Sequence, residues 1–435
     1  MKSLLDKVNA KLNAQGGFLK AVSILVGGTV FAQGLAILAL PILTRIYSPT
    51  DFSLFAVYTS LIMVLSVASC LRFEIAIPIP KEKEEAVNLV ALSFISNLII
   101  SLIVFLVIII FYPQIIELLG QPKFAQLIWF VPVGVFFLGL YNTFQYWATR
   151  QKQFKVIAKT RIIQSFGGVV TQILLGVLGF FSFGLIIGQI IKVSAGIRNL
   201  IKNFLDDSHE IFKKINFISL KKTFIRNKNF PKYSTFEALA NTAGVQLPII
   251  FIASKVGGGE AGHLMLAMQV MAIPIAFIGN AVSQVYLAHA SEKLQQGQLK
   301  EFTITCLYSL FKIGVLPLIL ISILSPYAFP LIFGAEWERS GEMMVWMIPW
   351  FCFQLLVSPI SMSLNILNEQ KIALLLQIIG LIIRYFGVCV LFYLSISSKL
   401  FEYYAISGGI FYFLYLCVTI YVINIYDKNI NKFYL

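Results

Sequence analysis

Charged residues are scarce in this sequence. Only 12% of the 435 residues are Asp, Glu, Lys or Arg, whereas 58% are apolar and the mean hydropathy is +0.83. A water-soluble domain carries about a quarter charged residues, so an ordinary soluble enzyme is excluded. The five cysteines are far apart and lie in apolar segments, and the three histidines form no cluster. The sequence therefore offers neither a disulfide framework nor a metal-ligand motif.

The apolar residues are gathered in runs long enough to cross a bilayer. A spanning helix needs about 20 mostly apolar residues, whereas a membrane β-barrel would show ~10-residue segments of alternating polarity. The long runs predict an all-α polytopic membrane protein with twelve transmembrane helices, near residues 21–44, 52–71, 86–111, 125–148, 162–182, 184–203, 233–253, 262–285, 302–325, 343–366, 372–394 and 402–425.

The longest polar stretch divides these spans into six and six. It predicts two six-helix lobes on either side of a basic cytoplasmic linker: an amphipathic N-terminal segment 1–20, an N-lobe 21–203, the linker 204–232, a C-lobe 233–426 and a tail 427–435. A short repeat, Leu40-Pro41-Ile42-Leu43 against Leu247-Pro248-Ile249-Ile250, supports the division. Paired halves of this kind are typical of alternating-access transporters.

Lysine and arginine are unevenly distributed between the two sides of the predicted bundle. Basic loops resist translocation, so they mark the cytoplasmic side. The linker and the N-terminal segment are rich in them, whereas the other side has only Arg45, Lys123, Lys255, Arg339 and Lys399. This distribution explains a net charge of +14 without nucleic acid as a partner, and it predicts that both termini are cytoplasmic.

Five segments, in their order and spacing, carry a family pattern. They are Leu43–Phe52 (LTRIYSPTDF), Leu71–Pro78 (LRFEIAIP), Phe230–Ser234 (FPKYS), Ile278–Val285 (IGNAVSQV) and Phe333–Trp337 (FGAEW). Over roughly residues 20–395 the chain resembles the Wzx-type flippases for lipid-linked oligosaccharides. These belong to the polysaccharide biosynthesis branch of the multidrug/oligosaccharidyl-lipid/polysaccharide exporter superfamily.

The resemblance implies a V-shaped, MATE-like transporter in the bacterial inner membrane. Its cargo would be undecaprenyl-pyrophosphate-linked oligosaccharide repeat units, moved from the cytoplasmic to the periplasmic leaflet for O-antigen, capsule or exopolysaccharide biosynthesis. The implied partners are membrane lipids, a polysaccharide polymerase and chain-length regulator, and H+ or Na+. No cofactor and no metal are implied, and the protein would not be an enzyme.

Cations inside the spans are the first candidates for binding such a cargo. Moving two phosphate charges past hydrocarbon requires a polar, cationic surface in place of water. Arg384 lies mid-span, and its guanidinium fork suits phosphate, although a structural hydrogen bond to a neighbouring helix is an alternative. Lys312 lies near the middle of its span, and Lys192 lies close enough to the cytoplasmic end to extend its ammonium group there.

Charged residues at the span ends form a second group. Arg45 and Arg72 are candidates for substrate contact or gating, but Glu74 is close enough in sequence to make a structural ion pair with Arg72 equally consistent. Glu237, in the first turns of the seventh span, is the candidate for binding a coupling ion. It could also occupy a plain interface position.

Amide side chains are the candidates for glycan contact. Asn142 and Gln145 lie in the segment Tyr141-Asn142-Thr143-Phe144-Gln145-Tyr146-Trp147, and Asn280 lies in the other half. The aromatic residues near span ends are equally typical of an interfacial belt. Two other functions stay open: a MATE-like small-molecule antiporter, and a membrane glycan polymerase or ligase, for which the short loops show no catalytic constellation.

Overall fold

The computed structural model describes residues 18–213, 215–257, 259–279, 282–283, 286, 289–290, 293–294, 296–367, 369–394 and 400–433. Over these residues the chain forms helices and no strand, which confirms the all-α fold class. Most of the predicted N-terminal segment 1–20 lies outside the described residues, as does Asn280. The chain forms two compact units: unit 1 extends to Tyr47 and resumes over Tyr58–Leu239, and unit 2 comprises Ser48–Val57 and Ala240 onward.

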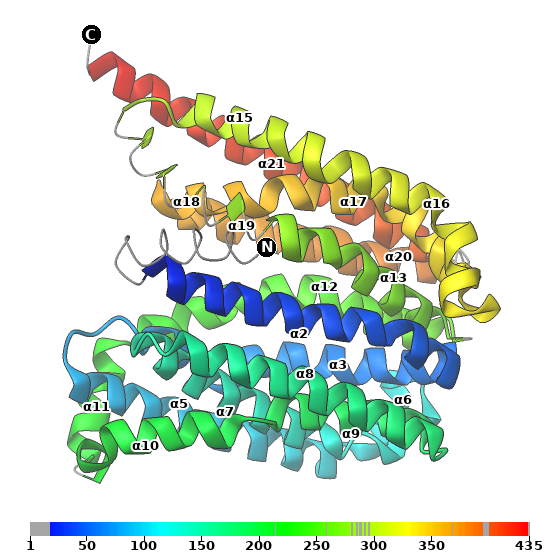
Figure 1. Ribbon diagram of the computed structural model, residues 1–435, viewed down its shortest axis with the longest axis horizontal. Helices are drawn as coiled ribbons and strands as arrows, with labels where there is room; N and C mark the ends of the chain where they lie inside the picture. The colour runs from blue at the N-terminus through cyan, green and yellow to red at the C-terminus, as the bar shows by residue number, and fades with distance from the viewer. Residues whose placement is uncertain are drawn as a thin grey trace, which may run out of the picture. The chain divides into compact units, whose positions relative to one another are not determined.

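Unit 1 is a bundle of long helices that run side by side (Figure 1). Helix α8 packs against α2 and α9, and α7 packs against α5, α9 and α10. The helices of this unit are α2 (Phe18–Ile46), most of α3 (Pro49–Ser69), α4 (Phe73–Ala76), α5 (Lys83–Ile110), α6 (Tyr112–Leu119), η1 (Pro122–Gln126), α7 (Phe130–Arg150), α8 (Phe154–Val177), α9 (Phe181–Ser194), α10 (Ile197–Lys213), α11 (Phe217–Arg226), the π-helical turn η2 (Phe230–Ser234) and the start of α12 (Thr235–Lys255).

A sharp break separates α3 from α4. Leu71 and Arg72 both adopt left-handed backbone conformations, with φ of 50° and 60°. This conformation costs a non-glycine residue roughly 1 kcal/mol or more, so the surrounding packing must impose it. The next residue, Phe73, is fully buried in a cluster with Trp147 and Phe204. The break therefore directs the chain back into the bundle and sets the direction of Arg72 and Glu74.

Unit 2 is a second helical bundle, in which α17 packs against α13, α16 and α21. Several of its helices contain π-helical turns, which often occur at functional positions. Its described elements are the rest of α12, α13 (Glu260–Pro274), the π turn η3 (Ile275–Gly279), α15 (Leu299–Leu310), the π turn η4 (Phe311–Val315), α16 (Leu316–Phe333), η5 (Ala335–Trp337), α17 (Glu338–Ile360), α18 (Met362–Ile366), α19 (Gln370–Leu381), the π turn η6 (Ile382–Phe386), α20 (Gly387–Tyr393) and α21 (Leu400–Phe433).

The first turns of α3 pack within unit 2. The Phe52 ring lies edge-on to Trp337 with centroids 4.9 Å apart, and both side chains are buried. A Cβ at Gly262 would lie only 2.1 Å from the Pro49 carbonyl oxygen, so only glycine allows this approach. One helix thus contributes residues to both units.

Eleven helices among the described residues are long and apolar enough to cross a membrane. They correspond to eleven of the twelve predicted spans, and the protein is a multi-pass membrane protein. The remaining predicted span, 125–148, corresponds to the 21-residue helix α7. Helix α7 is long enough to span, but polar residues in its second half keep it out of this set. By length and apolar composition, the described residues thus support eleven of the twelve predicted spans.

Candidate functional site

Helix α7 carries a polar stripe within unit 1. Five half-buried residues with polar groups recur at helical spacing on one face of its second half: Tyr141, Asn142, Gln145, Tyr146 and Thr149. The opposite face, including Phe144 and Trp147, is buried in the core. Hydroxyl and amide groups in this pattern form a surface that can hydrogen-bond sugar hydroxyls. Asn142 and Gln145, both predicted as glycan contacts, lie on this stripe.

Arg161 adds a cation beside the stripe. Its Nη1 donates a hydrogen bond to Thr29 Oγ1 at 2.5 Å, and its guanidinium also hydrogen-bonds Tyr141. The sequence placed Arg161 in a loop before a span at 162–182, but α8 begins at Phe154, so Arg161 lies two turns inside a membrane-spanning helix. Helix α8 can begin before the predicted span because the basic side chains of Lys155 and Lys159 in its first turns are exposed.

Arg72 and Glu74 form an ion pair near the stripe. Their side chains approach to 3.8 Å between Arg72 Nη1 and Glu74 Oε1, as predicted for a structural pair. Tyr146 of the stripe interacts electrostatically with both charges. The pairing is incomplete, because Arg72 Nε and Glu74 Oε2 are buried without a hydrogen-bond partner in the described part of the chain.

Glu74 is a buried carboxyl group that lies outside the membrane-spanning segments. Its side chain is only 5% exposed, and burial raises its pKa to about 7, since the charged form loses its hydration. The Arg72 guanidinium lowers the pKa, but its effect is smaller than that of burial. Glu74 can therefore change its protonation state near neutral pH. Sequence reasoning treated it only as a partner of Arg72.

Three further predicted residues of unit 1 have exposed side chains. Lys192 lies on α9 and Arg45 lies in the last turn of α2. Glu237 lies in the first turn of α12. A Cβ at Gly168 would lie 2.7 Å from Lys192 Cβ, so α8 and α9 approach closely beside this lysine. The aliphatic stem of Lys192 therefore lies against α8.

Arg384 is fully buried inside unit 2. It lies in η6 with an exposed fraction of 0%, and its guanidinium carbon is 4.4 Å from the centroid of the Phe411 ring. Its Nε donates to the Gly380 carbonyl at 3.0 Å, a bond within its own helix and not the bond to a neighbouring helix considered as the structural alternative. Nη1 and Nη2 have no hydrogen-bond partner among the described residues. Cβ atoms at Gly244 and Gly380 would each lie 2.9 Å from Nη2, so glycines make room for it.

Lys312 has a different environment. It lies in the π turn η4, its side chain is exposed, and its ammonium nitrogen lies 4.4 Å from the centroid of the Tyr308 ring. A cation over an aromatic face is held by the ring quadrupole. The two predicted cations of unit 2 therefore do not share an environment, because one is sealed and one is accessible.

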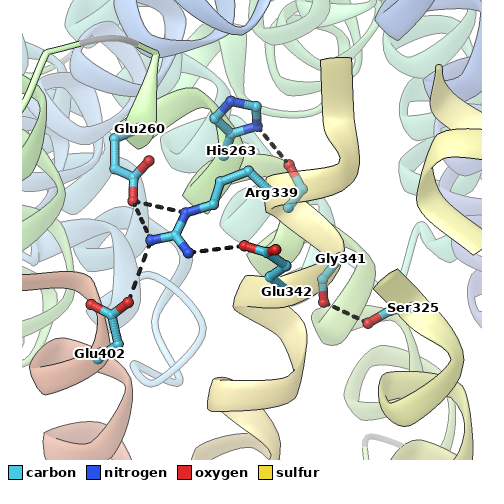
Figure 2. Close-up of polar contacts among 8 residues, drawn as sticks. Glu260, His263, Ser325, Arg339, Gly341, Glu342 and Glu402 are labelled. Carbon is cyan, nitrogen blue, oxygen red and sulfur yellow. Dashed lines mark hydrogen bonds and ion pairs between the residues drawn. The ribbon is translucent and has the colours of Figure 1, made fainter. Parts of the chain in front are cut away.

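A charged cluster that the sequence did not predict joins three helices of unit 2 (Figure 2). Arg339 Nη2 lies 2.9 Å from Glu260 Oε1 and 3.4 Å from Glu402 Oε1, and Nη1 lies 3.0 Å from Glu342 Oε2. These residues lie in the first turns of α13, α17 and α21. Beside them, His263 Nδ1 is hydrogen-bonded to Ser340 Oγ at 3.1 Å. The network fixes the ends of the three helices against one another.

Comparison with known proteins gives the family. The family model of polysaccharide biosynthesis proteins matches residues 42–342, which is more than half of the chain. The chain belongs to this family. The succinoglycan biosynthesis transport protein ExoT of Rhizobium meliloti (strain 1021) is 23% identical over 328 residues, a match that covers 74% of this chain and 64% of ExoT.

Solved structures show the same fold. The lipid II flippase MurJ in an inward closed conformation superposes with a TM-score of 0.72 at 15% identity, covering 90% of this chain and 86% of MurJ. An inward-facing multidrug resistance MATE family transporter gives 0.66 at 15% identity, covering 91% and 96%. The fold of this family member is thus that of MATE-like transporters and flippases. ExoT is a transport protein and MurJ is a flippase, in agreement with the transporter class expected from the sequence.

Proposed function

We propose that this protein is a flippase for undecaprenyl-pyrophosphate-linked oligosaccharide repeat units. It moves them from the cytoplasmic to the periplasmic leaflet for assembly of an O-antigen, capsule or exopolysaccharide. The α7 stripe carries the proposal: a membrane-spanning bundle has placed hydroxyl and amide groups, with Arg161 beside them, on one half-exposed helix face. Polar residues at such positions are costly in a membrane and mark a substrate path.

The chemistry of the cargo matches the groups on this surface. Sugar hydroxyls both donate and accept hydrogen bonds, as do Asn142 and Gln145. The pyrophosphate needs cations, which Arg161, Arg72 and the exposed Lys192 supply within unit 1. A hydrophobic amphiphile would need a more apolar surface than this, so the stripe favours a glycan over the substrate of a drug antiporter.

The remaining cations have supporting roles in the proposal. Exposed Lys312 and Arg45 attract the anionic headgroup without being sealed from water. Arg384 is sealed in the described conformation, so it meets the pyrophosphate in a second conformation in which α12 and α21 separate around it. The two unpaired NH2 groups of this buried guanidinium, Nη1 and Nη2, favour an opening of unit 2 that lets an anion bind.

The coupling ion in this proposal is H+. Glu74 binds and releases a proton near neutral pH, because burial raises its pKa to about 7. It lies in unit 1, beside the stripe residue Tyr146. Glu237, the residue expected from the sequence, is exposed and serves as an entry position for cations.

The place of action is the bacterial inner membrane, with both termini in the cytoplasm. This orientation follows from the basic loops, and the cargo itself is made at the cytoplasmic face. A polysaccharide polymerase and a chain-length regulator would receive the flipped units on the periplasmic side.

Deletion of the gene provides the test in cells. The deletion strain should accumulate undecaprenyl-pyrophosphate-linked single repeat units in the cytoplasmic leaflet, because synthesis continues while translocation stops. Lipid-linked glycans are extracted and sized, and their leaflet is assigned by protection from a glycosidase added to spheroplasts.

Two other results would contradict the proposal. Single repeat units that are sensitive to the added glycosidase would indicate a polymerase instead. Normal polysaccharide together with increased sensitivity to small toxic amphiphiles would indicate an antiporter.

A further inference from the structure

Helix α11 is fixed by polar contacts to the beginning of α5. Arg226 Nη1 lies 2.8 Å from Glu85 Oε2, and Ser219 Oγ donates to Asn88 Oδ1 at 3.3 Å. A capping box between Asn216 and Ser219 closes its first turn. This short helix therefore has a defined orientation on unit 1.

The face of α11 that points away from α5 is apolar. Phe217 is 78% exposed, Ile218 is 79% exposed and Ile225 is 54% exposed. Three large apolar side chains are thus exposed on one short, docked helix, a feature typical of an interaction site.

Basic residues lie on the same side. At 100° per residue, Lys221 falls between Phe217 and Ile218 on the helix circumference and Lys222 falls at the edge of the apolar arc; both are exposed. Helix α11 contains no acidic residue to neutralise them. An apolar arc with lysines within it and beside it is typical of helices that lie in a membrane interface.

The position of α11 matches this pattern. Its contacts Glu85 and Asn88 lie in the first two turns of α5, a membrane-spanning helix that begins at Lys83. Figure 1 shows α11 turned across the direction of α5 and α10. The helix thus lies at the level at which the hydrocarbon begins, and it runs along the membrane surface.

We propose that the α11 surface, formed by Phe217, Ile218, Lys221, Lys222 and Ile225, binds anionic phospholipid headgroups. The apolar side chains enter the boundary between headgroups and acyl chains, and the two ammonium groups contact the lipid phosphates. Each basic residue near an anionic membrane surface strengthens binding about fivefold. This interaction concerns the surrounding lipid and does not depend on which cargo the protein carries.

Hydrogen–deuterium exchange tests this proposal on the full-length protein in nanodiscs. Backbone amides of residues 217–226 should exchange several-fold more slowly in discs of phosphatidylcholine with 30% phosphatidylglycerol than in discs of phosphatidylcholine alone. The variant K221E/K222E should lose this difference. The variant F217S/I218S should raise exchange in both kinds of disc.

The matched control is K155E/K202E, which makes the same charge change at exposed positions outside α11. It should keep the wild-type dependence on phosphatidylglycerol. In plain phosphatidylcholine, K221E/K222E should exchange as the wild type does, which shows that α11 is still folded. Equal exchange of wild-type α11 in the two lipid mixtures would overturn the proposal. Protection that appears only when other cellular proteins are present would overturn it as well, in favour of a protein partner.

Discussion

Arg384 is a buried cation whose cost the surrounding residues offset only in part, through the Gly380 carbonyl and the Phe411 ring. A guanidinium with unpaired NH2 groups in a low-dielectric site destabilises the fold, because the desolvated charge loses its hydration without gaining full hydrogen bonding. Arg384→Met should therefore raise the thermal unfolding midpoint of the purified protein. Glycan export should be lost in the same variant, because the group that meets the pyrophosphate is gone. A fluorescence melting curve and quantification of surface polysaccharide measure the two effects.

Arg384→Lys is the matched variant for this prediction. It keeps the charge and removes the fork, so it should restore only part of the export. A methionine variant that exports normally would show that Arg384 has no part in transport.

Glu74 makes stability depend on pH. Its pKa is about 7 in the folded protein against 4.5 as the ordinary value, so the folded state binds the proton more tightly. Stability from this group is complete below about pH 4.5 and is lost as the pH rises through 7, by about 3 kcal/mol at most. Glu74→Gln should thus unfold at a higher temperature than the wild type at pH 8, with a smaller difference at pH 5.5.

The exposed carboxylate Glu117 supplies the control. Glu117→Gln should match the wild type at both pH values. A Glu74→Gln variant with the same midpoint difference at pH 5.5 and pH 8 would contradict the raised pKa. Glu74→Gln should also lose any stimulation of transport by a pH gradient.

At the scale of elements, the polar stripe of α7 is the proposed glycan-binding surface. Asn142→Leu with Gln145→Leu would make its exposed face apolar and improve its hydropathy as a membrane span. We expect normal abundance in the membrane but export reduced by about tenfold or more, since each lost hydrogen bond to a sugar is worth ~1 kcal/mol and two are removed. Immunoblotting and polysaccharide quantification check the two outcomes.

Helix α7 itself offers the control variant for this prediction. Leu138 is half-buried on the same helix, two turns before Gln145, and Leu138→Ala changes volume without changing polarity. Export close to wild type in N142L/Q145L would remove the stripe from the substrate path.

The element scale also shows what the sequence could predict. Apolar runs determine where helices can cross a membrane, so eleven predicted spans have counterparts in the structure. The predicted start of the span at 162–182 was eight residues later than the start of α8. The charged residues Lys155, Lys159 and Arg161 were assigned to a loop, although Lys and Arg are good helix formers and the two lysine side chains are exposed. The left-handed pair Leu71 and Arg72 depends on distant packing around Phe73, which no local pattern encodes.

For the whole molecule, the family agrees with the role in polysaccharide biosynthesis expected from the sequence, and the fold agrees with the expected MATE-like fold. The candidate site was predicted less completely than the fold. Asn142, Gln145 and Arg72 could be proposed from the sequence because their residue types are unusual near a span, and their contact with substrate stays a prediction. Arg161 and the Arg339 cluster were missed, because each depends on which helices lie beside it in space. Depth within the bundle, which separates sealed Arg384 from exposed Lys312, is likewise a property of packing.

Reconstitution tests the central claim, that the protein moves a lipid-linked glycan across the membrane without covalent chemistry. Purified protein in liposomes is given a fluorescent undecaprenyl-pyrophosphate-linked oligosaccharide, and its accessibility to an external glycosidase is followed with time. The lipid should exchange between leaflets only in vesicles that contain the protein, and mass spectrometry should find its pyrophosphate bond and glycan length unchanged. No exchange beyond that of protein-free vesicles, or cleavage or extension of the glycan, would contradict the assignment as a flippase.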